Sequence, residues 1–408
     1  MSFVSFGFLG FLLLSLAFFH LVRTPRARRR VLGAANFAFL GTFIPDPASA
    51  LAMLGFVVGS FALVAAVQTR RWPRVLWVTI PIAIAFLAWV KRYAFLGLVL
   101  PDAWLGHGLT IVGVSYMTFK TIHVLVDRHE EQLPPVHFWP FVHYQIGFFS
   151  LVSGPIQRYG DYLAFWDRID RGPGSAEETV RNWGRVLGGI VKIGVPGALA
   201  LAVWEAAMQG TAALGSFDAP LWRLCLIFYA YPVYIYFNFS GYCDVVIGAA
   251  GMFGMRQVEN FDRPWLARNM IDFWDRWHMS LTAWIRDYVF LTSYKAVVQR
   301  WPAHARSGGV ALLFGALLLA GIWHGSSWNF VVFGLVHGLG VAAARVWTDT
   351  LKQRLGRRGL QRYDANPWIR RVAVVATFHY ACFSFLFFIP GLGRHLSHLA
   401  SIWGEVLS

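Results

Sequence analysis

Long apolar segments alternate with short polar ones along the whole chain. Residues 3–22 are nearly all apolar, and residues 31–68 form an apolar region that Pro45-Asp46-Pro47 interrupts. Proline pairs end helices, so this region predicts two helices joined by an acidic turn. Further apolar segments follow at residues 75–90, 109–126, 138–153, 184–206, 219–255, 308–322, 325–346, 372–390 and 395–406. The pattern is typical of membrane-spanning helices.

Two regions depart from this pattern. Residues 154–183 place Arg158 and other charged residues among aromatics and glycines, and residues 256–300 mix charges with tryptophan and phenylalanine. A lipid-facing helix does not tolerate such a density of charge. We expect the first region to be a surface loop or a partly buried amphipathic segment. We expect no simple span in the second, and a less regular stretch near Pro101–His107.

The pattern therefore predicts an all-α polytopic membrane protein. Roughly eleven membrane-embedded helices are expected, in a single domain over residues 1–408. Composition agrees, because 57% of residues are hydrophobic and only 14% are charged, against about 25% charged in an average soluble chain. A soluble protein cannot keep so much apolar surface out of water, whereas a lipid bilayer can.

The net charge of +15 raises the question of nucleic-acid binding. The basic residues cluster beside apolar segments, at Arg23–Arg30, Arg70–Arg74 and Lys352–Arg371. Such clusters are typical of the positive-inside bias, so nucleic acid is rejected as a partner. We therefore expect a multi-pass protein of the cell membrane. The bias places these basic clusters in the cytoplasm and the N-terminus on the outer side of the membrane. Residues 348–371 are expected to form a basic loop.

The cysteines and the common motifs exclude several chemistries. Cys225, Cys243 and Cys382 lie in apolar or aromatic surroundings without CxxC or metal-type spacing. We expect them to be buried apolar residues, and we expect no metal site. The chain also lacks GxGxxG, the Walker motif, GxSxG and HExxH. Nucleotide, serine-hydrolase and zinc-protease chemistries therefore have no support.

His324 is the first candidate for chemistry. It lies in Gly321-Ile322-Trp323-His324-Gly325, between two apolar segments. An ionisable residue at membrane depth is costly and marks function by default. A neutral imidazole in a dry pocket is a good general base for a hydroxyl group. The alternative, a histidine satisfied by a helix carbonyl, stays open on the residues alone.

His337 lies thirteen residues further on, in Gly334-Leu335-Val336-His337-Gly338. If one helix carries both histidines, their imidazoles lie about 20 Å apart on different faces. They then share neither a metal nor a proton. We expect His337 to pack or to line a channel.

His278 lies in an unusually aromatic and charged stretch. On a helix, Trp274, His278 and Thr282 share one face, and Asp275 lies one turn before His278, within reach of a hydrogen bond. A half-buried polar helix suits the wall of a cavity. The alternative is an interfacial helix whose tryptophans lie at headgroup level.

Two neighbouring segments carry further polar candidates. Trp284-Ile285-Arg286-Asp287-Tyr288 continues the charged stretch, and Asn238-Phe239-Ser240-Gly241-Tyr242-Cys243-Asp244 belongs to an aromatic span. The Asp244 carboxylate needs a partner there, for which we expect an arginine from the stretch around His278. This signal is weak by itself.

Together these segments resemble the membrane-bound O-acyltransferase family. The matching motifs are FWxRWH at 273–278, WxRDY at 284–288, WHG at 323–325, GxxHG at 334–338, FNFSGY at 237–242, NF at 260–261 and SGPI at 153–156. They occur in order and are concentrated in residues 150–340. Within the family, the chain is most similar to the bacterial teichoic-acid D-alanyl transfer proteins and next to those that O-acetylate alginate.

The resemblance implies a fold with a central tunnel and a transfer reaction across the membrane. A cytoplasmic thioester, on the phosphopantetheine of a carrier protein or as acetyl-CoA, donates the acyl group. A hydroxyl of an extracytoplasmic envelope glycan accepts it, and no cofactor stays bound. The basic cytoplasmic segments suit an acidic carrier protein. Relay through a further membrane or extracytoplasmic protein stays an open alternative.

The resemblance also assigns roles to residues. His324 is the general base and His278 the second polar group of the site. Tryptophans at 323, 328 and 277 are expected to enclose the pocket and exclude water, which otherwise hydrolyses the donor. The substrate-binding candidates are Trp323, Trp328, Trp277, Trp274, Asp275, Arg286, Asp287, Asn238, Asp244 and Arg158.

Two alternatives remain at this point. A transporter or flippase with histidines in its pathway belongs to a different class, and inverted-repeat symmetry, which is not visible in the sequence, would favour it. D-alanyl and acetyl transfer, by contrast, share one fold, and no residue pattern separates them.

Overall fold

The computed structural model describes most of the chain. The described residues are 5–69, 75–93, 96–97, 100–101, 112–171, 174–210, 219–389 and 392–407. Arg70, Arg71 and Arg74, most of Pro101–His107 and the start of the apolar segment 109–126 lie outside them. The contacts divide the chain into two compact units, which are taken in turn. The expectation of a single domain stays a prediction.

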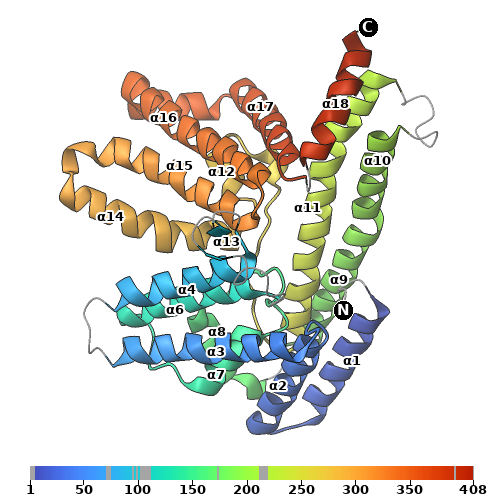
Figure 1. The fold of residues 1–408 in the computed structure, drawn as a ribbon, viewed down its shortest axis with the longest axis vertical. Coiled ribbons are helices and arrows are strands. Elements are labelled where there is room, and N and C mark those ends of the chain that lie inside the picture. Colours follow the sequence, from blue (N-terminus) through green and yellow to red (C-terminus); the bar gives the residue numbers. More distant parts are fainter. Residues whose placement is uncertain are drawn as a thin grey trace. The chain divides into compact units, whose positions relative to one another are not determined.

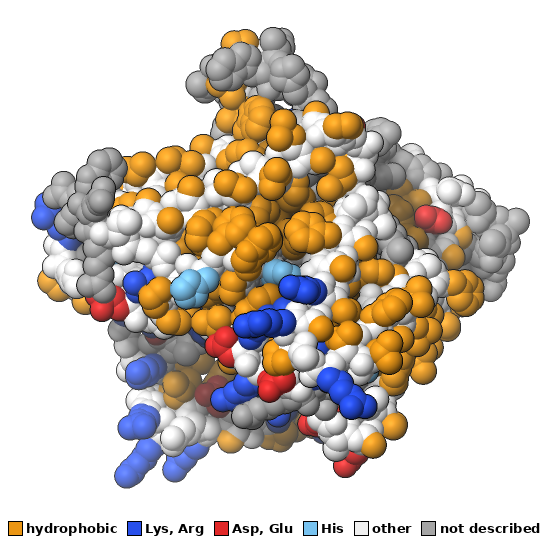
Figure 2. Space-filling model, turned by 90° about the horizontal axis from the view of Figure 1, so that it is seen from below, with side chains coloured by type: hydrophobic (Ala, Val, Ile, Leu, Met, Phe, Trp, Pro, Cys, Tyr) orange, Lys and Arg blue, Asp and Glu red, His pale blue; other side chains and the backbone are white. Residues whose placement is uncertain are grey.

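The expected all-α polytopic fold is confirmed. Helices are the only extended regular elements among the described residues, and one isolated β-bridge accompanies them (Figure 1). Several helical stretches among the described residues are long and apolar enough to cross a membrane. They are Pro47–Gln68, Ala176–Gln209, Pro220–Met252, Pro302–His324, Trp328–Ala365 and Pro367–Leu386. Figure 2 shows hydrophobic side chains over much of one face, with charged side chains grouped over another part of it. The total of eleven helices and the tunnel stay predictions.

The first unit comprises Met1–Ile190 and Gly241–Glu259. Its helices are α1 (Phe6–Leu21), α2 (Pro25–Gly41), α3 (Pro47–Gln68), α4 (Leu76–Lys91), α6 (Val114–His129), α7 (Phe138–Ile146), α8 (Tyr159–Asp167) and most of α9 (Ala176–Lys192). The predicted break before Pro47 is confirmed, because Asp46 Oδ1 accepts a 2.8 Å hydrogen bond from the Ser49 N–H and caps α3. Aspartate before a first-turn proline is a strong helix start.

Helix α7 is shorter than the expected segment 138–153, and a buried lysine explains where it ends. Lys120 on α6 is almost fully buried. Lys120 Nζ donates to the carbonyl oxygens of Tyr144, at 2.8 Å, and Gln145, at 3.4 Å. The last carbonyls of a helix lack partners within the helix and carry its negative dipole end. The Lys120 amine therefore satisfies carbonyl groups at the C-terminus of α7 inside the unit.

The second unit comprises Val191–Ser240 and Asn260–Ser408. Its elements are η3 (Ile193–Gly197), α10 (Ala198–Gln209), the first part of α11 (Pro220–Met252), η5 (Pro264–Leu266), α12 (Met270–Trp274), α13 (Met279–Ile285), η6 (Arg286–Phe290), α14 (Leu291–Arg300), α15 (Ala305–His324), α16 (Trp328–Ala365), α17 (Pro367–Leu386) and α18 (Leu392–Leu407). Helices α15 and α16 lie side by side as a hairpin (Figure 1).

Paired glycines set the close approach of this hairpin. A Cβ atom added to Gly321 would lie 2.4 Å from the Cα atom of Gly334, and one added to Gly334 would lie 2.8 Å from the Leu318 carbonyl oxygen. Only glycine leaves room for two helix backbones at this distance. The hairpin carries His324 at the end of one helix and His337 within the next.

Two expectations about irregular regions need correction. The basic stretch 348–371 is mostly helical rather than a loop, because α16 extends to Ala365 with a kink at Gly356, where the backbone is not helical (φ 64°, ψ −178°), and α17 starts at Pro367. Arginine and lysine are good helix formers, so a basic run continues a helix. The charged region 154–183 contains α8 and the start of α9, which supports the amphipathic alternative over a plain loop.

Within the first unit, α9 and α11 also meet through glycines. A Cβ atom on Gly189 would lie 2.5 Å from the Gly241 carbonyl oxygen, and one on Gly248 would lie 2.7 Å from the Asn182 carbonyl oxygen. Small residues of this kind let membrane helices pack at short distance.

Gly248→Ala should therefore destabilise the protein. The added methyl forces α9 and α11 apart, at a cost of about 1–3 kcal/mol in the free energy of unfolding. Thermal unfolding of the purified protein in detergent measures the effect. The matched control is Gly184→Ala on α9, where nothing lies within 4 Å of an added Cβ atom. The control should keep or raise the melting temperature, and equal melting temperatures for both variants would contradict this packing.

Candidate functional site

The chain around His278 is held by a short antiparallel pairing within the second unit. Phe261 forms an isolated β-bridge with Trp277. The Asp262 N–H donates to the Arg276 carbonyl, and the Met279 N–H donates to the Asn260 carbonyl, both at 3.0 Å. Backbone groups in a buried site need such partners. The pairing sets residues 276–279 directly against residues 260–262.

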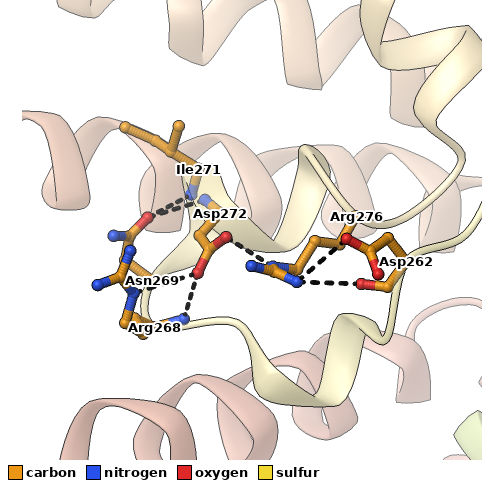
Figure 3. A network of polar contacts seen from close by, with 6 residues as sticks. All are labelled: Asp262, Arg268, Asn269, Ile271, Asp272 and Arg276. Atoms are coloured by element: carbon orange, nitrogen blue, oxygen red, sulfur yellow. Dashed lines mark hydrogen bonds and ion pairs between the residues drawn. The ribbon is translucent and has the colours of Figure 1, made fainter. Parts of the chain in front are cut away.

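Side-chain charges reinforce this pairing (Figure 3). Asp272 Oδ1 accepts a hydrogen bond from Arg276 Nε at 2.7 Å, and Arg276 Nη1 lies 3.4 Å from Asp262 Oδ2. Asp272 Oδ2 accepts from the Arg268 N–H at 2.9 Å. Asn269 caps α12 by accepting from the N–H groups of Ile271 and Asp272. Arg276, the arginine of the FWxRWH motif, is therefore part of the scaffold and pairs with two carboxylates outside the motif.

His278 does not lie on the expected continuous helix. Its backbone is left-handed, with φ 47° and ψ 50°, and it separates α12 from α13. Trp274, His278 and Thr282 therefore do not share one helix face. A left-handed conformation costs a residue other than glycine about 1–2 kcal/mol and persists where the surroundings impose it. Here the pairing with residues 260–262 supplies that constraint.

The His278 ring is only 2% exposed, and Asn260 orients it. Asn260 Oδ1 accepts hydrogen bonds from the Ser280 N–H at 3.0 Å and the Ser280 hydroxyl at 2.8 Å, so it faces His278 Nδ1, 3.3 Å away, as an acceptor. Nδ1 therefore carries the proton, and Nε2 is the acceptor of the neutral ring. Burial lowers the pKa of His278 to about 3, which keeps the ring neutral near pH 7.

His324 ends α15 and is partly exposed. Its ring centroid lies 4.7 Å from that of Trp323, 4.9 Å from that of Phe388 and 5.8 Å from that of Phe333. Trp323 therefore contacts His324, and its role in enclosing a pocket stays a prediction. A partly exposed imidazole among aromatic rings is reachable by a ligand and still shielded from bulk water.

His337 lies much closer to His324 than expected. The two histidines are on different helices, and both rings contact Phe333, at 5.8 Å for His324 and 4.2 Å for His337. Their centroids are therefore no more than 10.0 Å apart, which rules out the expected 20 Å. The turn between α15 and α16 folds the second histidine back beside the first. The sequence estimate failed because it assumed one continuous helix.

His337 is fully buried and has a defined tautomer. Trp274 Nε1–H donates to His337 Nδ1 at 3.2 Å, so the neutral ring carries its proton on Nε2. Within the described part of the chain, this Nε2 has no hydrogen-bond partner. A buried N–H group without a partner costs free energy and calls for an explanation. Neither Asn260 nor Trp274 had been predicted to orient a histidine, since spacing along the chain does not show contacts across it.

Four other predicted site residues of the second unit differ in burial and in their contacts. Trp277 is buried and stacks on Phe273 at 5.6 Å. Asp275 is exposed and forms no hydrogen bond with His278 among the described contacts, so the predicted bond is wrong. Its place is taken by Asn260. Arg286 and Asp287 pair with each other at 3.0 Å in η6.

Trp328 and Asn238 were also predicted to bind substrate, and this role stays a prediction for both. Trp328 is 80% exposed at the start of α16, outside the aromatic contacts around the histidines. Asn238 is partly buried on α11. Their positions in the structure do not by themselves assign Trp328 or Asn238 to substrate binding.

Asp244 and Arg158 belong to the first unit. Asp244 Oδ1 accepts from Arg185 Nε at 3.0 Å, and Arg185 Nη1 also donates to Glu259 Oε1 at 2.7 Å. The expected partner from the stretch around His278 is therefore wrong, and α9 supplies the arginine. Arg158 immediately precedes α8. Substrate contact by either residue stays a prediction.

Comparison with known proteins adds the family context. The model of the membrane-bound O-acyltransferase family, MBOAT, matches residues 120–387, about two thirds of the chain. A teichoic acid D-alanyltransferase of Streptococcus thermophilus is 27% identical over 292 residues, 69% of this chain and 68% of that protein. One of Lacticaseibacillus rhamnosus is 26% identical over 372 residues, 85% and 86% of the two chains. A probable alginate O-acetylase of Pseudomonas aeruginosa is 31% identical over 244 residues, 59% of this chain and 44% of that protein.

His278 should make stability depend on pH. Its folded pKa is about 3, and an unfolded histidine titrates near 6.5. Between these values the unfolded chain binds a proton that the folded chain does not, so stability falls as pH drops from about 6.5. His278→Gln should flatten the decline of stability between about pH 6.5 and 4, by up to 1.4 kcal/mol per pH unit.

Unfolding of purified protein across this pH range tests the expectation. His304→Gln is the matched control, because His304 is exposed and its removal should leave the slope unchanged. Identical slopes for wild type and His278→Gln would show that the imidazole is not held neutral by burial.

Proposed function

The chain belongs to the membrane-bound O-acyltransferase family, and we propose that it transfers a small acyl group, D-alanyl or acetyl, across the cell membrane. The donor is a cytoplasmic thioester, and the acceptor is a hydroxyl of an extracytoplasmic envelope glycan or polymer. The names of the matched relatives support both the choice of acyl group and the class of acceptor. The observation that carries the proposal is the pair of imidazoles, His324 and His337, held around one phenylalanine beside the aromatic segment of His278.

His324 is the proposed general base. An alcohol has too high a pKa to attack a thioester unaided, and a positioned base contributes about 10²–10⁴-fold in rate. The base takes the hydroxyl proton while the oxygen attacks the thioester carbonyl, and the thiol leaves as the ester forms. The rings of Trp323, Phe333 and Phe388 around His324 shield the thioester from water.

The two buried histidines supply opposite hydrogen-bonding atoms. His278 offers an acceptor at Nε2, and His337 offers a donor at Nε2 that has no partner in the described structure. A donor aimed at developing charge on a carbonyl oxygen is worth about 10²–10³-fold in acyl transfer. His337 therefore has more to contribute than the packing role expected from its spacing, and His278 completes the polar lining.

The donor and its carrier follow from the same proposal. The thioester is carried on the phosphopantetheine of an acidic carrier protein or on coenzyme A, with no permanently bound cofactor. Arginines of the exposed end of α16, among them Arg354, Arg357, Arg358 and Arg362, suit an acidic surface. A further membrane or extracytoplasmic protein is a candidate relay. The inner membrane is the proposed location, with the N-terminus outside.

Alanine variants of the three histidines test the proposal. Ester-linked groups are released from the cell-envelope glycan with mild base and identified by mass spectrometry, at matched abundance in the membrane. Wild type should yield D-alanine or acetate. His324→Ala should lose the ester almost completely, His278→Ala should lower it strongly, and His337→Ala should lower it less than His324→Ala, consistent with about 10²–10⁴-fold for a base.

The exposed His304 again offers a control, since His304→Ala should keep wild-type ester. Retained ester in His324→Ala would refute the general-base role. A loss in His337→Ala that exceeds that in His324→Ala would show that the roles of the two histidines are reversed.

A further inference from the structure

Two neighbouring cavities of the second unit have no histidine in their lining. One, of about 690 Å³, is lined from α11, α17 and residues 261–265. The other, of about 580 Å³, lies between α10 and α11. Val233 and Phe237 line both, so the two spaces adjoin along one face of α11. A D-alanyl or acetyl group needs neither volume.

The smaller cavity has an apolar lining and opens on apolar surface. Leu199, Trp222 and Val233 belong to it and are 64%, 52% and 37% exposed. Its walls, α10 and α11, belong to stretches that are apolar and long enough to cross a membrane. From Trp222 to Phe237 the groove follows about 22 Å of helix, compared with about 15 Å for one leaflet of the hydrocarbon core. The bilayer itself supplies a chain of suitable length and chemistry.

The larger cavity adds positive charge to aromatic walls. Lys192 and Arg263 line it, together with Asp262, whose carboxylate already lies 3.4 Å from Arg276 Nη1. Arg263 is exposed and has a left-handed backbone, with φ 47°. No hydrogen bond or ion pair engages its guanidinium within the described residues. An arginine beside membrane-spanning helices is costly unless it meets an anion or water.

We propose that the two cavities form one binding site for an anionic phospholipid of the bilayer. Its chains lie along α11 in the smaller cavity, and its phosphate binds the Arg263 guanidinium at the larger one. Guanidinium matches phosphate in charge and in the geometry of paired hydrogen bonds. Because Phe273 and Trp277 also line the larger cavity, the lipid contacts the segment that holds His278.

Lipid binding by the purified, delipidated protein in detergent tests this site. Phosphatidylglycerol and phosphatidylcholine with the same chains are titrated, and bound lipid is measured by native mass spectrometry and by the rise in melting temperature. Phosphatidylglycerol should bind about tenfold more tightly than phosphatidylcholine. Arg263→Gln should weaken the affinity for phosphatidylglycerol by about tenfold, a loss of about 1.4 kcal/mol in binding free energy. The matched control Arg300→Gln, at an exposed arginine that ends α14, should leave this affinity unchanged.

A second variant and a second ligand test the chain-binding half. Val233→Trp fills the junction of the cavities and should weaken both lipids, and Val233 is exposed enough to accept a larger side chain. Glycerol phosphate, which has the headgroup chemistry without chains, should bind far more weakly than phosphatidylglycerol. Equal affinity for the two lipids, an unchanged preference in Arg263→Gln, or glycerol phosphate binding as well as the lipid would each overturn the proposal. Because acyl transfer is not the readout, these outcomes leave the proposed function standing.

Discussion

Polar and charged groups inside an apolar helical protein must pair with one another, and this constraint shapes the segment on which the site depends. The carboxylates of Asp262 and Asp272 hold Arg276, and the backbone of residues 260–262 binds that of residues 276–279. Together these contacts impose a left-handed backbone on His278 and bring Asn260 against its ring. The Arg276 and Asp272 side chains are only partly exposed, so their ion pair is less screened by water than one on the open surface.

The second constraint is steric. Gly321 and Gly334 let α15 and α16 approach so closely that the turn after His324 returns the chain to His337. The two imidazoles then both lie against Phe333 but differ in burial, because His324 is partly exposed whereas His337 is buried and oriented by Trp274. The chemistry of the WHG and GxxHG motifs thus depends on glycines that bear no functional group themselves.

Much of this architecture was predictable from the sequence. Apolar segment length identified the helices, and the prolines around Asp46 marked the start of α3, because these signals are local. The predictions that failed concerned contacts between residues far apart in the sequence, or depended on where a helix breaks. The spacing of Trp274 and His278 suggested one helix, and the count from His324 to His337 suggested 20 Å, because neither pattern reveals a turn. Asn260 as the partner of His278, and Arg185 as the partner of Asp244, lie 18 and 59 residues away.

In the proposed function, the protein passes an acyl group through the membrane to a hydroxyl. Proteoliposomes containing the purified protein test it most directly, with an acyl thioester of pantetheine outside and a hydroxylated glycan inside. We expect the protein molecules whose donor side faces outward to form an ester on the enclosed glycan as thiol is released outside. Appearance of intact thioester or of glycan on the opposite side, without any ester, would contradict it and identify a transporter.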